Sequence, residues 1–330
     1  MTGANGREPN AAPLTSILIV SYMSAKHLGP CLDSILRQTG SPFEVVLVDN
    51  ASTDGSADIV ERDYPMARLI RSGENLGFAK GNNVGLPYCQ GKYILLLNPD
   101  TVMTDGSLHA LVDCMEKSPD VSAAGCRILY PDGSPQLSCG AFPTMASAVW
   151  GGQAVNRLLK KIFPEADFFG ACGVVPERLD ERLEVDTLLG ACVILRRDVI
   201  EKTGLFDESM FLYFEECDLF YRIKKAGGKV IYTPDAVVYH YAGGSVICTR
   251  EAVGYYLDSQ ERYLIKNFGL KRVQVFRVLV MLSSLIKSAL ISLAYPFARK
   301  ADAERQAKKI AWHWSAFLCR LELFFPFIKS

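Results

Sequence analysis

Short runs of continuous Ile, Leu and Val alternate with amphipathic stretches between residues 14 and about 126. The strand-type runs cover residues 14–22, 43–50, 67–72, 92–98 and 121–129, and the helix-type stretches cover residues 28–38, 56–64, 79–89 and 107–118. Strands with almost no polar alternation belong to sheets that are buried on both faces. The pattern therefore predicts an α/β fold in which a mostly parallel sheet carries helices on both faces.

The rest of the chain is less regular. Residues 127–185 mix turn-rich sequence with an amphipathic helix and receive no functional assignment. From residue 186 onward the pattern predicts a strand and a short helix, then a helix closed by Gly227 and Gly228, then two short strands within 229–241. We expect a disordered lead-in over residues 1–13, a domain over 14–254 with halves at 14–126 and 127–254, and a helical tail over 255–330.

The formal net charge of zero hides a basic tail. Residues 261–330 carry 13 Lys and Arg against 4 Asp and Glu, a net charge of +9, which leaves −9 on residues 1–260. Because this tail is also rich in Leu, Ile, Val and Phe, it favours an anionic membrane surface over nucleic acid as a partner. Residues 278–296 have the length of a membrane span, but Lys287 lies at their centre, which favours a helix pair in the membrane interface. Packing of these helices on the core is the remaining alternative.

The cysteines and the N-terminus bear on the compartment. Ten cysteines are scattered without a Cys-x-x-Cys pair, which disfavours a zinc site and a disulfide framework and fits a reducing environment. The first 15 residues hold no apolar stretch typical of a signal peptide. We therefore expect the protein at the cytoplasmic face of the plasma membrane, and the sequence leaves a homo-oligomer open.

Acidic side chains follow two of the predicted strands. Asp49 ends one strand and precedes the turn "NASTDGS", in which Ser52 and Asp54 could simply cap the next helix. The functional alternative is that the Asp49 carboxylate accepts a hydrogen bond from a ring N–H of a nucleobase. Asp100 ends the corner "LNPD" after another strand, where the alternative is a simple turn. Parallel strands would bring both carboxylates to the rim of the sheet at which ligands bind.

A loop rich in glycine and asparagine covers residues 74–85, "ENLGFAKGNNVG". Glycines let a backbone approach a ligand closely, and the N-terminal amides of the helix that begins here would face anionic groups. The alternative is a flexible connector whose Asn residues cap that helix. The chain has neither a Gly-x-Gly-x-x-Gly fingerprint nor a Walker loop, which argues against an NAD enzyme and a P-loop NTPase.

Two further groups could carry chemistry. Glu215, Glu216 and Asp218 crowd together in "YFEECDLFYR" beside apolar residues. Clustered carboxylates raise one another's pKa, as a general base requires, although solvated acids at a helix start are a serious alternative. His240 ends a predicted strand and is by default structural, but it could share a cation with a carboxylate from another strand end.

Taken in order, these motifs resemble the family 2 glycosyltransferases, and most of all their bacterial rhamnosyltransferase-type branch. The resemblance spans about residues 14–248 and rests on "VVLVDNASTDGS", "NLGFAKGNNVG", "YILLLNPD", "GACVILRRDVIEKTGLFDE" and "FEECDLFYR". It implies a GT-A fold and an inverting, single-displacement transfer from a dTDP- or UDP-sugar. The expected reaction moves L-rhamnose from dTDP-rhamnose to a hydroxyl of a glycan at the cell surface or on a polyprenyl lipid.

The resemblance also implies roles for single residues. Glu216 stands at the position of the catalytic base, with Asp218 and Glu215 behind it, and Asp100 and His240 match a Mg²⁺ or Mn²⁺ site. The residues matched to the nucleotide and donor site are Val20, Ser21, Tyr22, Asp49, Asn50, Ser52, Asn75, Gly77, Phe78, Gly81, Asn82, Asn98, Gly190 and Ala191.

Two positions depart from the family pattern. Asn98 replaces the first Asp of the Asp-x-Asp motif, and Glu216 replaces the usual Asp and is one methylene longer. These departures keep a second hypothesis open, a non-catalytic subunit of the same fold that binds a sugar nucleotide or a glycan. A nucleotidyltransferase is the third, but it needs several basic residues near the first loop, where only Lys26 stands.

Overall fold

The computed structural model describes residues 14–143, 180–241 and 250–294, together with Trp314. The chain forms two compact units. The first, here called the sheet unit, combines residues 1–142, 173–211 and 215–244, and the second, the tail unit, combines 143–172, 212–214 and 245–330. The expected lead-in at 1–13, the amphipathic helix before residue 180 and the end of the tail from 295 lie outside the described residues, apart from Trp314.

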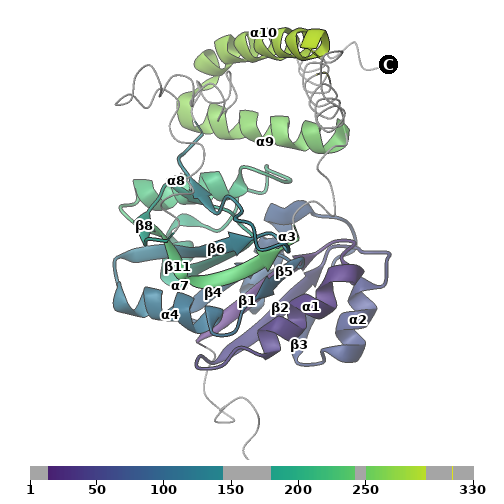
Figure 1. The fold of residues 1–330 in the computed structure, drawn as a ribbon, viewed down its shortest axis with the longest axis vertical. Coiled ribbons are helices and arrows are strands. Elements are labelled where there is room, and N and C mark those ends of the chain that lie inside the picture. Colours follow the sequence, from purple (N-terminus) through teal and green to yellow (C-terminus); the bar gives the residue numbers. More distant parts are fainter. Residues whose placement is uncertain (1–13, 144–179, 242–249, 295–313, 315–330) are drawn as a thin grey trace, which may run out of the picture. The chain divides into compact units, whose positions relative to one another are not determined.

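The first half of the sheet unit is the parallel sheet that the alternating pattern predicts (Figure 1). Its strands are β1 (Thr15–Ser21), β2 (Phe43–Asp49), β3 (Ala67–Arg71) and β4 (Tyr93–Leu97), and its helices are α1 (Ala25–Leu36), α2 (Ser56–Asp63), α3 (Gly77–Gly85) and the 3-10 turn η1 (Leu86–Tyr88). Strand β1 pairs in parallel with both β2 and β4, and β3 pairs in parallel with β2. The carboxyl ends of these four strands therefore share one rim.

The second half of the sheet unit makes the sheet mixed. It contains β5 (Thr101–Met103), α4 (Ser107–Lys117), β6 (Val121–Leu129), β8 (Leu183–Glu184), β10 (Cys192–Arg196), α7 (Arg197–Thr203), α8 (Glu215–Lys225) and β11 (Lys229–His240). The strand order is β3-β2-β1-β4-β10-β6-β11-β5, and β8 adds to β11. Strand β10 runs antiparallel between β4 and β6, which places the residues before it beside the end of β4. Two short strands, β7 (Cys139–Gly140) and β9 (Thr187–Leu188), pair separately.

The expectation of two short strands within 229–241 is wrong. These residues form the single strand β11, which pairs with β6 on both sides of a register shift between Thr233 and Val237. Pro234 lies in the shifted stretch and cannot donate a hydrogen bond to the ladder. The strand absorbs the proline as an irregularity and carries on to His240, which is how His240 reaches the end of the sheet.

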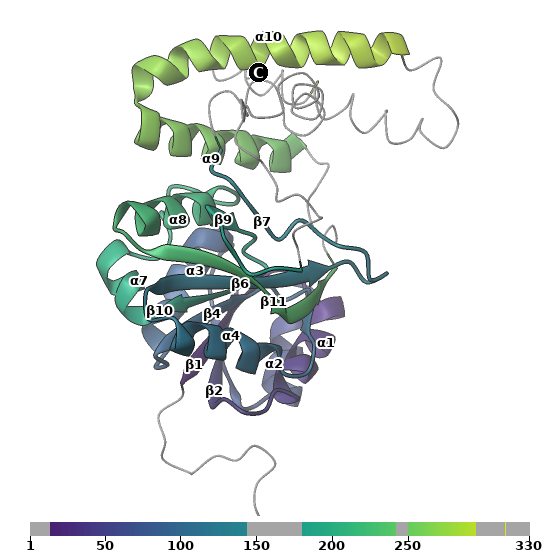
Figure 2. The ribbon, with the colours of Figure 1, turned by 60° about the vertical axis from the view of Figure 1, so that its left-hand side comes forward.

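Helices cover both faces of this sheet, as expected (Figure 2). Alternate residues of β1 show the arrangement, because Ile17 and Ile19 join the core under α1, α2 and α4, whereas Leu18 and Val20 join the core with α3, α7 and α8. Strands β1 and β4 are buried along their whole length. This double burial explains their uninterrupted apolar sequence.

The tail unit contains two helices in its described part, α9 (Arg250–Phe268) and α10 (Leu270–Ala294). Gly269, with φ of +85°, separates them in the left-handed conformation that glycine adopts without strain. The Arg277 side chain of α10 forms an ion pair with Glu261 of α9. Apolar side chains of α10 are exposed, namely Leu270, Val275, Val278, Leu279, Leu282, Leu285 and Ile286. Neither of these helices, nor any other in the described ranges, has an apolar stretch sufficient to cross a bilayer.

Candidate active site

Asp49 and the Asn98–Pro99–Asp100 corner lie at the same rim of the sheet. Asp49 is the last residue of β2 and pairs with Ser21, the last residue of β1. The corner follows β4 directly, and β4 is the other parallel neighbour of β1. Strands β2 and β4 are thus two strand spacings apart, or about 10 Å. This arrangement confirms the expected position of both carboxylates.

Asp49 is a buried carboxylate with a free oxygen. Its side chain is 3% exposed, and Oδ2 accepts a hydrogen bond from the Ser52 amide at 3.2 Å. The other oxygen, Oδ1, is buried and has no hydrogen-bond partner among the described residues. An unpaired carboxylate oxygen away from water is costly, so Asp49 is suited to a ligand that donates a hydrogen bond.

Asn50 and Asn75 organise the loop at 74–77. The Oδ1 atom of Asn50 accepts the amide of Leu76 at 2.9 Å, and its Nδ2 donates to Asn75 Oδ1 at 2.8 Å and to the carbonyl of Gly77 at 3.1 Å. Asn75 Oδ1 also accepts the Gly77 amide at 3.0 Å. These hydrogen bonds hold the shape of the loop at 74–77, here called the donor-side loop.

The glycine and aromatic positions of this loop are also explained by packing. Gly77 has φ of +77°, and a Cβ there would lie 2.4 Å from the carbonyl oxygen of Phe211. The Phe78 amide donates to the same carbonyl at 2.9 Å. A Cβ on Gly81 would lie 2.8 Å from Val20 Cγ1, so this glycine lets α3 approach β1.

Four more of the predicted donor-site residues differ in exposure and in whether their side-chain oxygens already have hydrogen-bond partners. Tyr22 is exposed, whereas Ser21 Oγ and Asn82 Oδ1 are buried atoms without a hydrogen-bond partner among the described residues. Asn82 Nδ2 donates to the Phe78 carbonyl within α3. Ser52 Oγ accepts the amide of Met23 and so ties the turn after β2 to the turn after β1. Met23 adopts φ of 51°, a conformation that is uncommon outside glycine.

Asp100 and His240 form a pair that fits a divalent cation. His240 Nε2 lies 3.3 Å from Asp100 Oδ1, and the imidazole is buried. His240 Nδ1 lies 2.8 Å from Gln136 Oε1, and this contact orients the imidazole ring. An unprotonated Nε2 and the Asp100 carboxylate oxygen would both be ligand atoms for such a cation. Among the described residues, no group of three or more His, Cys, Asp and Glu side chains gathers around a metal position.

Glu216 lies in the first turn of α8 and is half-buried. Its Oε1 accepts the Gly190 amide at 3.1 Å, and a Cβ on Gly190 would lie only 2.4 Å from that oxygen. Desolvation raises the pKa of the Glu216 carboxyl above its ordinary value, while the Gly190 amide opposes the rise. The carboxylate is therefore held in place by glycine backbone and is basic, as a general base must be.

The two neighbouring acids have different surroundings. Glu215 is 2% exposed, its Oε2 has no hydrogen-bond partner in the described part of the chain, and burial followed by the charge of Glu216 raises its pKa well above the ordinary value. Asp218 is fully buried, and its Oδ2 accepts a hydrogen bond from Arg222 Nε at 2.7 Å. Asp218 is thus engaged by an arginine one turn further along α8.

The dipeptide Gly190–Ala191 connects the acidic helix to the corner after β4. The Gly190 amide holds Glu216, and the Ala191 carbonyl accepts the amide of Asn98 at 3.0 Å. Asn98 Oδ1 is a further buried atom with no hydrogen-bond partner in the described ranges. Glu216 and Asp100 therefore belong to one continuous set of short contacts.

Sequence reasoning missed Gln136 and Arg222. Gln136 lies in the stretch for which the sequence indicated no function, 104 residues from the histidine that it contacts, so no local signal pointed to it. Arg222 follows Asp218 by one helical turn, and that spacing is a readable signal for an ion pair.

Comparison with known proteins agrees with this geometry. A model described as glycosyl transferase family 2 matches residues 16–169, and one described as glycosyl transferase family group 2 matches residues 93–328. The chain is 32% identical over 238 residues to N-acetylglucosaminyl-diphospho-decaprenol L-rhamnosyltransferase of Mycobacterium tuberculosis, which covers 68% of this chain and 75% of the relative. It is 25% identical over 259 residues to a low-salt glycan biosynthesis hexosyltransferase of Haloferax volcanii, which covers 76% of this chain and 75% of the relative.

A solved structure shows the fold. A mannosyltransferase of Pyrobaculum calidifontis, solved in complex with GDP-mannose and Mn²⁺, superimposes with a TM-score of 0.58 at 16% identity, over 99% of this chain and 91% of that one. The fold is GT-A, as the sequence motifs implied. On the family models, the relatives and this fold, the chain belongs to the family 2 glycosyltransferases and is similar to their rhamnosyltransferases.

Proposed function

We propose that this glycosyltransferase transfers L-rhamnose, with inversion, from dTDP-rhamnose to a hydroxyl of a lipid-linked glycan. The donor and the lipid-linked acceptor are supported by the relative from Mycobacterium tuberculosis, whose name specifies both an L-rhamnosyl group and an N-acetylglucosaminyl-diphospho-decaprenol. Within the chain, residues 14–254 would form the catalytic domain and residues 255–330 its helical tail.

The observation that carries the proposal is the set of contacts Glu216–Gly190–Ala191–Asn98, which joins an acidic side chain to the corner that holds Asp100. A transfer reaction needs a base for the acceptor hydroxyl close to the group that stabilises the departing diphosphate. Asp100 follows β4 at the rim that also contains Asp49, and Glu216 is linked to that corner through Gly190 and Ala191. A binding subunit without activity would not need a carboxylate of raised pKa at this place.

Asp49 would bind the base of the donor. Its free Oδ1 is aimed away from the Ser52 amide and is suited to the ring N–H of thymine or uracil. The loop at 74–76, shaped by Asn50 and Asn75, and the start of α3 would lie along the nucleotide. Ser21 and Asn82, with their buried unpaired oxygens, are further candidates for donor contacts.

Asp100 and His240 would hold a Mg²⁺ or Mn²⁺ ion, and the oxygens of the donor diphosphate would complete its coordination. A divalent ion there supplies charge that stabilises the diphosphate as it leaves. The structural relative from Pyrobaculum calidifontis was solved with Mn²⁺, which supports a divalent ion of this kind. Gln136 would orient the His240 ring, with Nε2 directed at Asp100.

Glu216 would accept the proton of the acceptor hydroxyl while that oxygen attacks the anomeric carbon from the face opposite to the diphosphate. Because a base acts only when deprotonated, the rate should fall as the pH drops through the pKa of Glu216, which desolvation raises above its ordinary value of 4.5. Asp218, engaged by Arg222, would serve the position of the helix and not the chemistry.

The tail would hold the enzyme at the cytoplasmic face of the plasma membrane, as a peripheral or monotopic protein. The exposed apolar side chains of α10, together with the net charge of +9 over residues 261–330, support contact with an anionic lipid surface. A lipid-linked acceptor would then be available at the same surface.

The direct test is a donor screen with the purified full-length enzyme. dTDP-L-rhamnose, other dTDP-sugars, UDP-sugars and GDP-sugars are incubated with an N-acetylglucosaminyl diphosphate lipid, and products are identified by mass spectrometry. We expect rhamnosylated lipid with Mn²⁺ or Mg²⁺ and loss of product with a chelator. Transfer of a different sugar would overturn the donor assignment, and undiminished transfer in the chelator would overturn the metal.

A further inference from the structure

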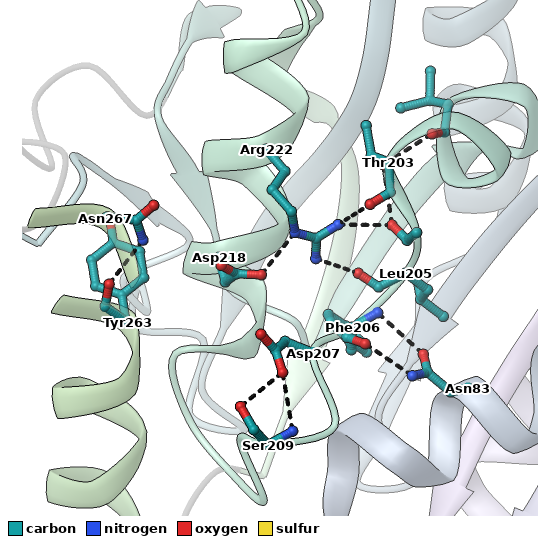
Figure 3. A network of polar contacts seen from close by, with 12 residues as sticks. Asn83, Thr203, Leu205, Phe206, Asp207, Ser209, Asp218, Arg222, Tyr263 and Asn267 are labelled. Carbon is teal, nitrogen blue, oxygen red and sulfur yellow. Dashed lines mark hydrogen bonds and ion pairs between the residues drawn. The ribbon is translucent and has the colours of Figure 1, made fainter. Parts of the chain in front are cut away.

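Side chains from two helices of the sheet unit, α3 and α8, form hydrogen bonds with one short segment, residues 203–208, here called the bridging loop. From α8, the Arg222 guanidinium donates to the carbonyls of Thr203 at 2.5 Å, Gly204 at 3.0 Å and Leu205 at 2.6 Å (Figure 3). The same guanidinium donates to the buried Asp218 carboxylate. Arg222 therefore closes the carboxyl end of α7 and orients the loop that follows it.

From α3, the Asn83 side chain holds the next residue of the loop. Its Oδ1 accepts the Phe206 amide at 3.1 Å, and its Nδ2 donates to the Phe206 carbonyl at 2.9 Å and to Glu208 Oε1 at 3.0 Å. Figure 3 shows this pair of bonds beside the Arg222 contacts. The Phe78 and Phe206 rings also pack, with their centroids 5.7 Å apart.

Arg222 and Asn83 bond to adjacent residues of the bridging loop, Leu205 and Phe206, but belong to different helices. Asn83 belongs to the helix that follows the donor-side loop, which Asn50 organises beside Asp49. Arg222 belongs to the helix whose first turn carries Glu216. Leu205 and Phe206 thus connect α3 to α8, the helix that carries Glu216.

We propose that Asn83 and Arg222 are positioning residues that act together through the bridging loop and keep Glu216 in register with the bound donor. This inference rests on the proposed transferase function and adds two residues to it. Neither side chain needs to touch the substrates. A displacement of about 1 Å at a reacting group can cost about 10²-fold in rate, so loosening either grip would be visible in turnover.

The variants are chosen to keep the fold. Arg222→Lys retains a cation beside Asp218 but loses the planar group that reaches three carbonyls. Asn83→Leu has a similar size and loses both bonds to Phe206. Ser209→Ala is the matched control, because Ser209 bonds only to Asp207 within its own turn, according to the described contacts.

The experiment measures steady-state transfer by the full-length enzyme at varied dTDP-rhamnose and pH, and dTDP affinity by calorimetry. We expect kcat to fall about 10-fold to 10²-fold in Arg222→Lys, with dTDP affinity within about twofold of wild type. The acid limb of the kcat profile should shift, because the surroundings of Glu216 change. A purely structural role would lower the melting temperature and leave that limb in place, which would overturn the proposal.

The double variant tests whether Asn83 and Arg222 act together on the bridging loop. If the bridging loop transmits both, Asn83→Leu combined with Arg222→Lys should lose about as much kcat as the worse single variant. If the double variant instead loses the product of the two single-variant losses in kcat, the two residues act independently and the joint action is overturned. Failure of this inference is distinguishable from failure of the proposed function, since in the latter the wild-type enzyme itself would transfer no rhamnose.

Discussion

At the scale of a single residue, the buried carboxylate of Asp49 lowers the stability of the fold but is suited to binding a ligand. A buried carboxylate with one oxygen unpaired, as the described contacts have it, lowers stability, and it makes sense where a ligand supplies the missing donor. The same reasoning does not apply to Asn50, whose amide is used by the loop at 74–77. Two adjacent residues of one turn thus have different tasks.

Replacing Asp49 with Asn should weaken nucleotide binding without weakening the fold. A hydrogen bond to a charged acceptor contributes about 1.5–3 kcal/mol, so the Kd for dTDP should rise about 10-fold to 10²-fold. The free energy of unfolding should stay level or increase, because a buried charge is removed. Calorimetric titration and denaturant unfolding measure the two effects. The exposed Asp58→Asn serves as control, and unchanged dTDP affinity in Asp49→Asn would refute the base-binding role.

Because of Glu215, the free energy of unfolding should decrease as the pH rises. Burial and the Glu216 charge raise its folded pKa well above the ordinary 4.5, so the folded state binds the proton more tightly than the unfolded state. Its contribution is complete below pH 4.5 and is lost as pH rises toward the folded pKa, by about 1.4 kcal/mol for each unit by which the folded pKa exceeds the ordinary one.

Glu215→Gln should therefore gain stability relative to wild type as the pH is raised from about 4.5. Denaturant unfolding of the wild type and the variant across pH 4–8 measures the difference. The exposed Glu201→Gln should show no such trend. A constant difference between Glu215→Gln and wild type at every pH would contradict the buried, proton-binding state.

At the scale of elements, the antiparallel strand β10 assembles the site. Because it inserts beside β4, the residues that precede it, Gly190 and Ala191, reach both Asn98 and the first turn of α8. A Cβ at position 190 would lie 2.4 Å from Glu216 Oε1, so a larger residue there would have to displace that carboxylate. The strand thus sets the distance between Glu216 and the Asn98–Pro99–Asp100 corner.

Gly190→Ala should lower kcat far more than it lowers nucleotide affinity. The added methyl would lie 2.4 Å from Glu216 Oε1 and must displace that carboxylate. We expect a loss of about 10²-fold in kcat, with dTDP affinity nearly unchanged. Gly254→Ala, where a Cβ would meet nothing within 4 Å, is the steric control and should keep full activity. Equal kcat in both variants would remove the steric argument.

The elements differ in how far the sequence predicts them. Continuous apolar runs at 14–22 and 92–98 define β1 and β4, and the parallel pairing of β1 with β2 and β4 follows from the helices between them. The antiparallel insertion of β10 was not predictable, because it depends on pairing across about 95 residues. Strand β11 was misjudged, since Pro234 indicates a break that the ladder in fact tolerates.

For the candidate site, the sequence predicts the residues that end strands but not the distant residues that contact them. Residues at the ends of parallel strands, such as Asp49 and Asp100, are placed by a simple rule of α/β sheets. The partners of those residues, Gln136 for His240 and Gly190 for Glu216, come from distant parts of the chain. No local pattern marks such contacts, so only the three-dimensional structure assigns them.

At the scale of the whole molecule, the chain combines an acidic first part with a basic, apolar tail. The net charge is −9 over residues 1–260 and +9 over residues 261–330. Apolar side chains remain exposed along α10. This division of charge supports the proposed contact between the tail and an anionic lipid surface.

The full-length protein should float with vesicles of anionic lipid and stay unbound with neutral ones. Leu279→Glu combined with Leu282→Glu, both about half exposed on α10, should reduce flotation several-fold. Leu137→Glu, at a similarly exposed site of the sheet unit, is the control and should bind as wild type does. Equal flotation of the α10 double variant and wild type would contradict the docking role of α10.

The most direct test of the account is turnover by Asp100→Ala and Glu216→Gln in the same assay of rhamnosyl transfer. The account predicts that each variant loses at least about 10²-fold in kcat, and that Glu216→Gln keeps its affinity for dTDP because Asp49 still binds the base. Full activity in both variants would contradict the assignment of the metal corner and the catalytic base.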